Sequence, residues 1–69
     1  MFIFPKIAKD ILTELIQAEE AGKPLTLEEA FGKWGKSSTW EDLVDNRFIF
    51  RYPEAVTVSA SGREWLKEH

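Results

Sequence analysis

A short segment near the middle of the chain combines side chains that commonly bind phosphate. Lysine ammonium groups, serine and threonine hydroxyls, and the free amides of a helix N-terminus all pair with phosphate oxygens. Two arginines further along the chain add two more cationic groups. If the segment opens a helix, these groups meet at one end of it. The predicted phosphate contacts are Lys33, Lys36, Ser37, Ser38, Thr39, Arg47 and Arg51.

Directly after this segment the charge reverses. Residues 37–46 hold three carboxylates and no basic residue, so their formal charge of -3 equals the net charge of the whole chain. In a helical projection these carboxylates point away from the side that carries Trp40, Leu43 and Val44. Such a face repels phosphate and suits a basic protein partner, or it only meets solvent. The candidate residues for a protein partner are Glu41, Asp42 and Asp45.

Catalytic and metal-binding chemistry has little support in the sequence. There is no cysteine, and the one histidine is the last residue, so thiolate sites and histidine pairs are excluded. Asp42 and Asp45 lie three residues apart on the expected helix, but no third ligand or base accompanies them. We therefore expect a protein that binds a partner without catalysis, a metal or a cofactor.

Length and composition predict one small domain over residues 1–69. The chain has 69 residues, of which 43% are hydrophobic, which is too many for a disordered tail. No stretch approaches the ~18 consecutive apolar residues that a membrane span needs. No signal peptide is visible at the start, so we expect a cytoplasmic location.

Hydrophobic spacing predicts a long helix over residues 6–21 and a short one after it. Gly22 and Pro24 stop the first helix, with the glycine in a left-handed conformation. Thr26 and Glu29 form a capping box that opens the second helix, which ends near Gly32 or Gly35. Its buried side is expected to hold the following residues: Leu27, Ala30, Phe31 and Trp34.

The remaining chain predicts a third helix, a hairpin and a last helix. Ser38 and Glu41 repeat the capping-box pattern and open a helix over roughly residues 39–46. The period then changes from 3.6 to 2, which indicates strands over residues 48–52 and 56–59 that pair as an antiparallel hairpin. A final helix begins after a cap at either Ser59 or Ser61, and packs Trp65 on the body.

Two groups of aromatic residues need a place in this arrangement. Phe48, Phe50 and Tyr52 share one strand face, which we expect to cover the core; stacking on single-stranded bases is the alternative. Phe2 and Phe4 precede the first helix and have no obvious place in so small a domain. They form either a third strand beside the hairpin or a contact between two copies of the chain.

The order of elements resembles a winged helix-turn-helix domain, and two segments strengthen the resemblance. Residues 43–49 (LVDNRFI) are similar to the L-x-x-x-G-L-I passage from recognition helix to wing, with Asn46 at the glycine place, where asparagine tolerates a left-handed backbone. Residues 56–66 (VTVSASGREWL) are similar to the V-x-L-T-x-x-G-R-x-x-L signature of MarR-type and PadR-type regulators, with Ser59 at the threonine place. The likeness covers residues 6–69. It implies an α+β fold with a three-helix core, a two- or three-stranded antiparallel wing and a short C-terminal helix.

The resemblance implies two functions. The first is DNA binding in transcription regulation, in which the seven predicted phosphate contacts at the third helix and the wing hold the backbone. The second is a protein-interaction winged helix, in which the acidic third helix docks a basic partner, and a homodimer through Phe2 and Phe4 is a further expectation. The two functions use groups of opposite charge: DNA binding uses the lysines and arginines, and docking of a basic partner uses the carboxylates of the third helix.

Overall fold

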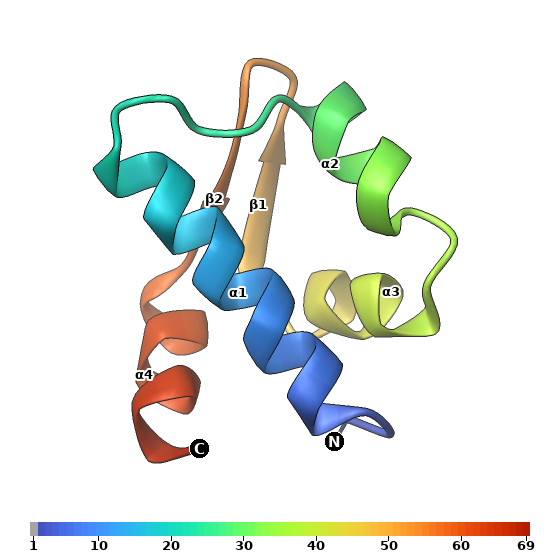
Figure 1. Cartoon of the computed structure of the whole chain (residues 1–69). Coiled ribbons are helices and arrows are strands. Elements are labelled where there is room, and N and C mark those ends of the chain that lie inside the picture. The colour runs from blue at the N-terminus through green and yellow to red at the C-terminus, as the bar shows by residue number, and fades with distance from the viewer. Residues whose placement is uncertain (1) are drawn as a thin grey trace.

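The computed structural model describes residues 2–69, and these residues form four helices and one two-stranded antiparallel sheet (Figure 1). The α+β architecture and the predicted order of three helices, a hairpin and a last helix are confirmed. Helix α1 crosses the hairpin, α2 and α3 lie on the β1 side of it, and α4 lies on the other side. The elements are α1 (Pro5–Glu20), α2 (Leu27–Trp34), α3 (Ser38–Asp45), β1 (Ile49–Tyr52), β2 (Ala55–Val58) and α4 (Ala60–Glu68).

Helix α1 is the central element of the core, and both of its ends follow the sequence signals. Pro5 occupies the first turn, where its missing N–H costs no hydrogen bond. Gly22 has a φ of 77°, and it donates to Glu19 O while Lys23 donates to Ala18 O, which forms a Schellman motif. The long apolar side of the helix is buried through Ala8, Ile11, Leu12 and Leu15. Within residues 2–69 no helix has the length and apolar character needed to cross a membrane.

The predicted capping box at the start of α2 is confirmed. The Glu29 N–H donates to Thr26 Oγ1 at 3.1 Å, and the Thr26 N–H donates to Glu29 Oε1 at 2.9 Å. The bond from the Thr26 backbone amide, followed by that from its hydroxyl, lowers the pKa of the Glu29 carboxyl. The helix ends at Trp34 with Gly35 as its C-cap, which is one of the two predicted ends.

Helix α3 starts one residue earlier than predicted. The Thr39 N–H donates to Ser37 Oγ at 3.1 Å, so Ser37 is the N-cap and Ser38 is already helical. The predicted capping box of Ser38 and Glu41 is therefore wrong. Two adjacent serines can cap this helix, and the cap at Ser37 is the one that accompanies burial of both Thr39 and Trp40 in the core.

The hairpin is antiparallel as predicted, but the strand face assigned to the core is wrong. In the register, Ile49 faces Val58 and Arg51 faces Val56. Ile49 and both valines are buried, whereas the Phe50 and Tyr52 side chains are 46% and 54% exposed. Phe50 shares its face of the sheet with Thr57, whereas Ile49 shares its face with the two valines. The face with the valines packs on the core, so the aromatic residues are left on the outer face.

Phe2 has a place in the core that the sequence did not indicate. It is 8% exposed, and its ring centroid lies 5.5 Å from that of Phe48 and 5.1 Å from that of Trp65. Residues 2–4 form no strand, so the sheet of the described residues has two strands and the predicted third strand is wrong. The assignment of Phe2 to a contact between copies is also wrong, because its own chain buries it. Phe4 remains 48% exposed.

The turn from α3 into β1 differs from the predicted one by one residue. Arg47 adopts the left-handed conformation with a φ of 57°, whereas Asn46 has a φ of -84° and donates from Nδ2 to Asp42 O. The left-handed position assigned to Asn46 is therefore wrong. The Ser59 hydroxyl donates to Arg47 O at 2.7 Å and accepts from the Gly62 N–H at 3.1 Å. Ser59, rather than Ser61, is thus the cap of α4.

Substituting Gly62 should destabilise the fold because α4 approaches the hairpin closely there. A Cβ at this position would lie 2.6 Å from the Phe48 carbonyl oxygen and 2.9 Å from Val58 Cγ1. We expect Gly62→Ala to lower the free energy of unfolding by about 1–3 kcal/mol in urea titrations. The matched control is Gly32→Ala in α2, where a Cβ meets nothing within 4 Å. It should raise the free energy of unfolding by about 0.5–1 kcal/mol, and equal effects of both variants would contradict the close approach.

Candidate functional site

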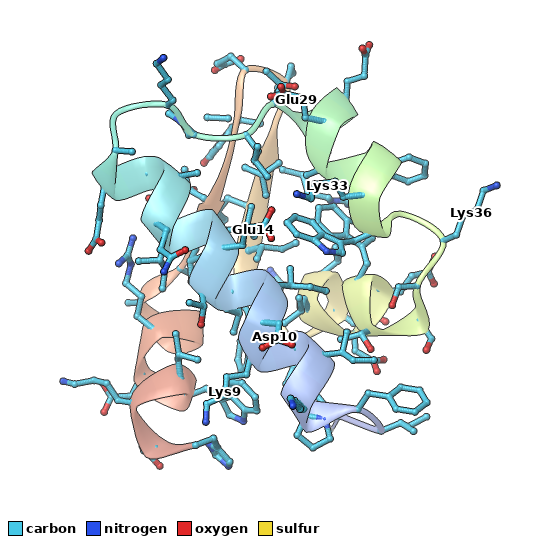
Figure 2. The ribbon with its side chains drawn as sticks, in the orientation of Figure 1. Lys9, Asp10, Glu14, Glu29, Lys33 and Lys36 are labelled. Carbon is cyan, nitrogen blue, oxygen red and sulfur yellow. The ribbon has the colours of Figure 1, made fainter. Side chains whose placement is uncertain are left out.

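The two lysines of the predicted phosphate cluster do not lie together. The Lys33 ammonium pairs with the Glu14 carboxylate of α1, and it also lies 5.3 Å from the centre of the Trp34 ring. Figure 2 shows Lys33 turned toward Glu14, while Lys36 extends away from the body of the protein. Of these two lysines, Lys36 is therefore the one free to meet an external anion.

The three hydroxyl residues of the cluster also differ in what they can reach. Ser37 Oγ accepts the Thr39 N–H and caps the helix, and the Ser37 side chain is half-buried with its O–H still able to donate. Thr39 is 1% exposed, which removes its side chain from any surface. The assignment of Thr39 to a phosphate contact is therefore wrong. Ser38 is exposed at the start of α3.

Arg47 follows the C-terminal end of α3, whereas Arg51 lies on β1, beside α2 and α3. Both are exposed, and neither forms an ion pair with another residue between 2 and 69. Helix α3 has eight residues, which at about 1.5 Å each separates its two ends by about 12 Å. The exposed cationic groups of the predicted cluster therefore do not form one patch: Lys36 precedes α3, Arg47 follows it, and Arg51 lies beside its carboxylates.

The carboxylates of α3 are not equally exposed. Glu41 and Asp45 are exposed, lie one turn apart and flank α2 and β1. Asp42 is half-buried and does not line the hollow that Glu41 and Asp45 share. Neither Glu41 nor Asp45 has an ion-pair partner among the described residues. The predicted acidic face therefore consists mainly of one pair of free carboxylates.

A hollow of about 260 Å³ lies beside this pair, between α2, α3 and β1. Its aromatic wall is Phe31, which is 56% exposed, and its floor includes the buried Trp40 ring, stacked on Trp34 at 6.3 Å. We use the name α3 hollow for the residues that line it, which are Phe31, Trp40, Glu41, Val44, Asp45 and Arg51. The hollow places two carboxylates and one guanidinium around an apolar centre.

Phe31 is the residue of this site that the sequence did not reveal. It falls on the same helical face as Ala30 and Trp34, so periodicity assigned it to the core, which is wrong. Gly35 follows it closely: a Cβ there would lie 2.6 Å from Phe31 Cγ. The absence of a side chain at Gly35 thus leaves room for the Phe31 ring over the helix end. No pattern in the sequence separates Phe31 from its buried neighbours.

Phe4 belongs to a second apolar area at the start of α1, with Ile3 at 73% and Ile7 at 43% exposure. It is not part of the α3 hollow, and its role as a contact between copies stays a prediction. Among residues 2–69, no group of three His, Asp or Glu side chains is placed to hold a metal ion. The chemistry available at the α3 hollow is therefore charge pairing and apolar contact.

The burial of the Thr39 hydroxyl, which excludes this residue from the binding surface, can be tested by substitution. Thr39 Oγ1 has no hydrogen-bond partner among the described residues. Thr39→Val keeps the shape of the side chain and removes this unpaired group, so we expect the free energy of unfolding to rise by about 1 kcal/mol. Thermal and urea unfolding measure it. A loss of stability would show that the hydroxyl has a partner, and Ser38→Ala provides the exposed control.

Comparison with known proteins does not extend this description. No protein-family model, no curated protein and no solved structure matches the chain. The function proposed for the chain therefore rests on the chemistry of its own residues.

Proposed function

We propose that the chain is a small winged-helix binding module that docks a basic segment of a partner protein at the α3 hollow. It acts by binding, without catalysis and without a cofactor. The order of its helices and hairpin is the order expected of a winged helix, which supports the fold part of this proposal.

The pair of free carboxylates on the rim of the hollow carries the proposal. Glu41 and Asp45 lie beside the exposed Phe31 ring, so a lysine or arginine can pair at the rim while its aliphatic stem covers that ring. Helix α3 contributes no basic residue that would compete for them. Arg51 stands across the hollow and adds a site for a carbonyl or carboxylate of the same segment.

Removing the two carboxylates should weaken binding of a basic peptide. The probe is a fluorescent heptapeptide that alternates lysine with valine, measured by anisotropy. We expect the double variant Glu41→Gln, Asp45→Asn to bind about fivefold more weakly, because each exposed pair contributes about 0.2–1 kcal/mol. Added salt should narrow the difference between this variant and the unmodified chain.

A carboxylate pair on α4 supplies the matched control. Glu64 and Glu68 have the same spacing and are exposed, and α4 lies across α1 from α3 in Figure 1. The double variant Glu64→Gln, Glu68→Gln makes the same change of charge, and we expect unchanged affinity. Equal weakening by both double variants would mean that net charge alone attracts the peptide, which contradicts the proposal.

DNA binding is the second candidate, because four of the seven predicted contacts are exposed and form no ion pair with another residue between 2 and 69. These four are Lys36, Ser38, Arg47 and Arg51. A salt-titrated mobility shift with duplex DNA of mixed sequence tests it. Retardation at low salt that is lost in Lys36→Gln and Arg47→Gln would support DNA binding. Absence of retardation at micromolar protein would count against it and is the result expected for the protein-docking module.

A further inference from the structure

The two strands of the hairpin differ at their outer edges. The outer edge of β2 is covered, since the Val56 N–H donates to Leu25 O at 2.8 Å and the Val58 N–H donates to Glu19 Oε2 at 3.1 Å. Both amides therefore point away from β1. The segment before α2 and the end of α1 occupy the place of a neighbouring strand on this side.

The register then fixes which groups of β1 point outward. Val56 faces Arg51 and Val58 faces Ile49. In an antiparallel pair, two facing residues either exchange both hydrogen bonds or direct their backbone groups to the two outer edges. Ile49 and Arg51 consequently present their N–H and C=O groups to the open edge of β1. No group within residues 2–69 hydrogen-bonds to these backbone atoms outside the sheet.

A second hollow runs along this open edge. It measures about 440 Å³, and Ile49, Phe50 and Arg51 of β1 form one side of it. Val44 and Asp45 of α3 line it as well, and these two residues and Arg51 also line the α3 hollow. The two hollows therefore adjoin each other beside the strand edge and the acidic helix, and together they are called the groove below. Arg51 is the exposed part of the edge, whereas Ile49 is 4% exposed.

We propose that the open edge of β1 accepts an extended segment of a partner protein as a third strand, with basic side chains facing α3. The proposal rests on the proposed function and adds backbone pairing to it. Strand addition gives affinity through main-chain hydrogen bonds, and alternate side chains give specificity. The backbone N–H and C=O of the exposed Arg51 form the first hydrogen bonds to the segment. The side chains of the segment that point inward meet Glu41 and Asp45.

The chemistry on both faces of the groove selects this occupant. Side chains that point inward meet the two free carboxylates of α3 and the one guanidinium of Arg51, and the excess of negative charge favours lysine or arginine. Those that point outward lie beside Phe50 and Tyr52, whose exposed rings are 6.1 Å apart, which favours apolar residues. A second copy of the chain would bring a second acidic α3 to the same groove, and like charges oppose that arrangement.

Backbone pairing can be separated from side-chain attraction with modified peptides. The ¹⁵N-labelled chain is titrated with the lysine–valine heptapeptide, and with two versions that are N-methylated at the lysines or at the valines. We expect the Arg51 amide resonance to move downfield and its hydrogen exchange to slow at least about tenfold in the complex. One methylated version should bind about tenfold more weakly and the other should keep its affinity, because alternate amides face β1.

A pair of variants tests the same edge from the protein side. Arg51→Pro removes the outward N–H, and Arg51→Ala removes the guanidinium but keeps the N–H. Because the Arg51 amide takes no part in the β1–β2 pairing, proline is tolerated at this edge position, and circular dichroism checks the fold. We expect the proline variant to bind the heptapeptide about fivefold more weakly than the alanine variant.

Two results would overturn the inference, and they differ in what they mean for the proposed function. If both methylated peptides bind as tightly as the parent, the segment docks through its side chains alone, and only the third strand is refuted. If the parent peptide does not bind at millimolar concentration, both the third strand and the basic docking site are refuted. Equal affinity of the proline and alanine variants, with both folded, would also contradict strand addition.

Discussion

Strand β2 forms hydrogen bonds along both of its edges and is buried on one face, and these contacts fix the position of the hairpin. Its valine side chains are buried, and its outward amides are bound by Leu25 O and by the Glu19 carboxylate. The same carboxylate accepts from Arg63 of α4 at 3.2 Å. Because Val56 and Val58 face Arg51 and Ile49, fixing β2 also decides which side chains of β1 enter the core. The exposed aromatic pair and the open strand edge are consequences of this one constraint.

Local signals in the sequence predicted much of the fold. The capping box of Thr26 and Glu29, the proline at the start of α1 and the left-handed Gly22 are each decided within a few residues. The helical cap at Ser37 was missed by one position because Ser38 offers the same chemistry. The strand face was missed because Phe48, Phe50 and Tyr52 alternate as clearly as the valines do. Only pairing between strands, which is not local, decides between the two faces.

The candidate site could be predicted only in part. The concentration of carboxylates on α3 is a property of one segment, so counting charges was sufficient to find it. The hollow beside them is built from three segments, with Phe31 supplied by α2 and Arg51 by β1. Burial of Thr39 and the pairing of Lys33 with Glu14 are likewise contacts between distant parts of the chain. Because of this burial and this ion pair, Thr39 and Lys33 are not available to bind phosphate. The carboxylates of Glu41 and Asp45 have no ion-pair partner among the described residues.

Ser59 joins three parts of the molecule through one hydroxyl. It donates to the carbonyl of Arg47 at the entry to the hairpin, and it accepts the amide of Gly62 in the first turn of α4. The entry to the hairpin and the first turn of α4 are therefore joined through a single side chain, and separating them would break at least one of these hydrogen bonds. A segment bound along β1 would thus lie on the same hairpin that Ser59 ties to α4.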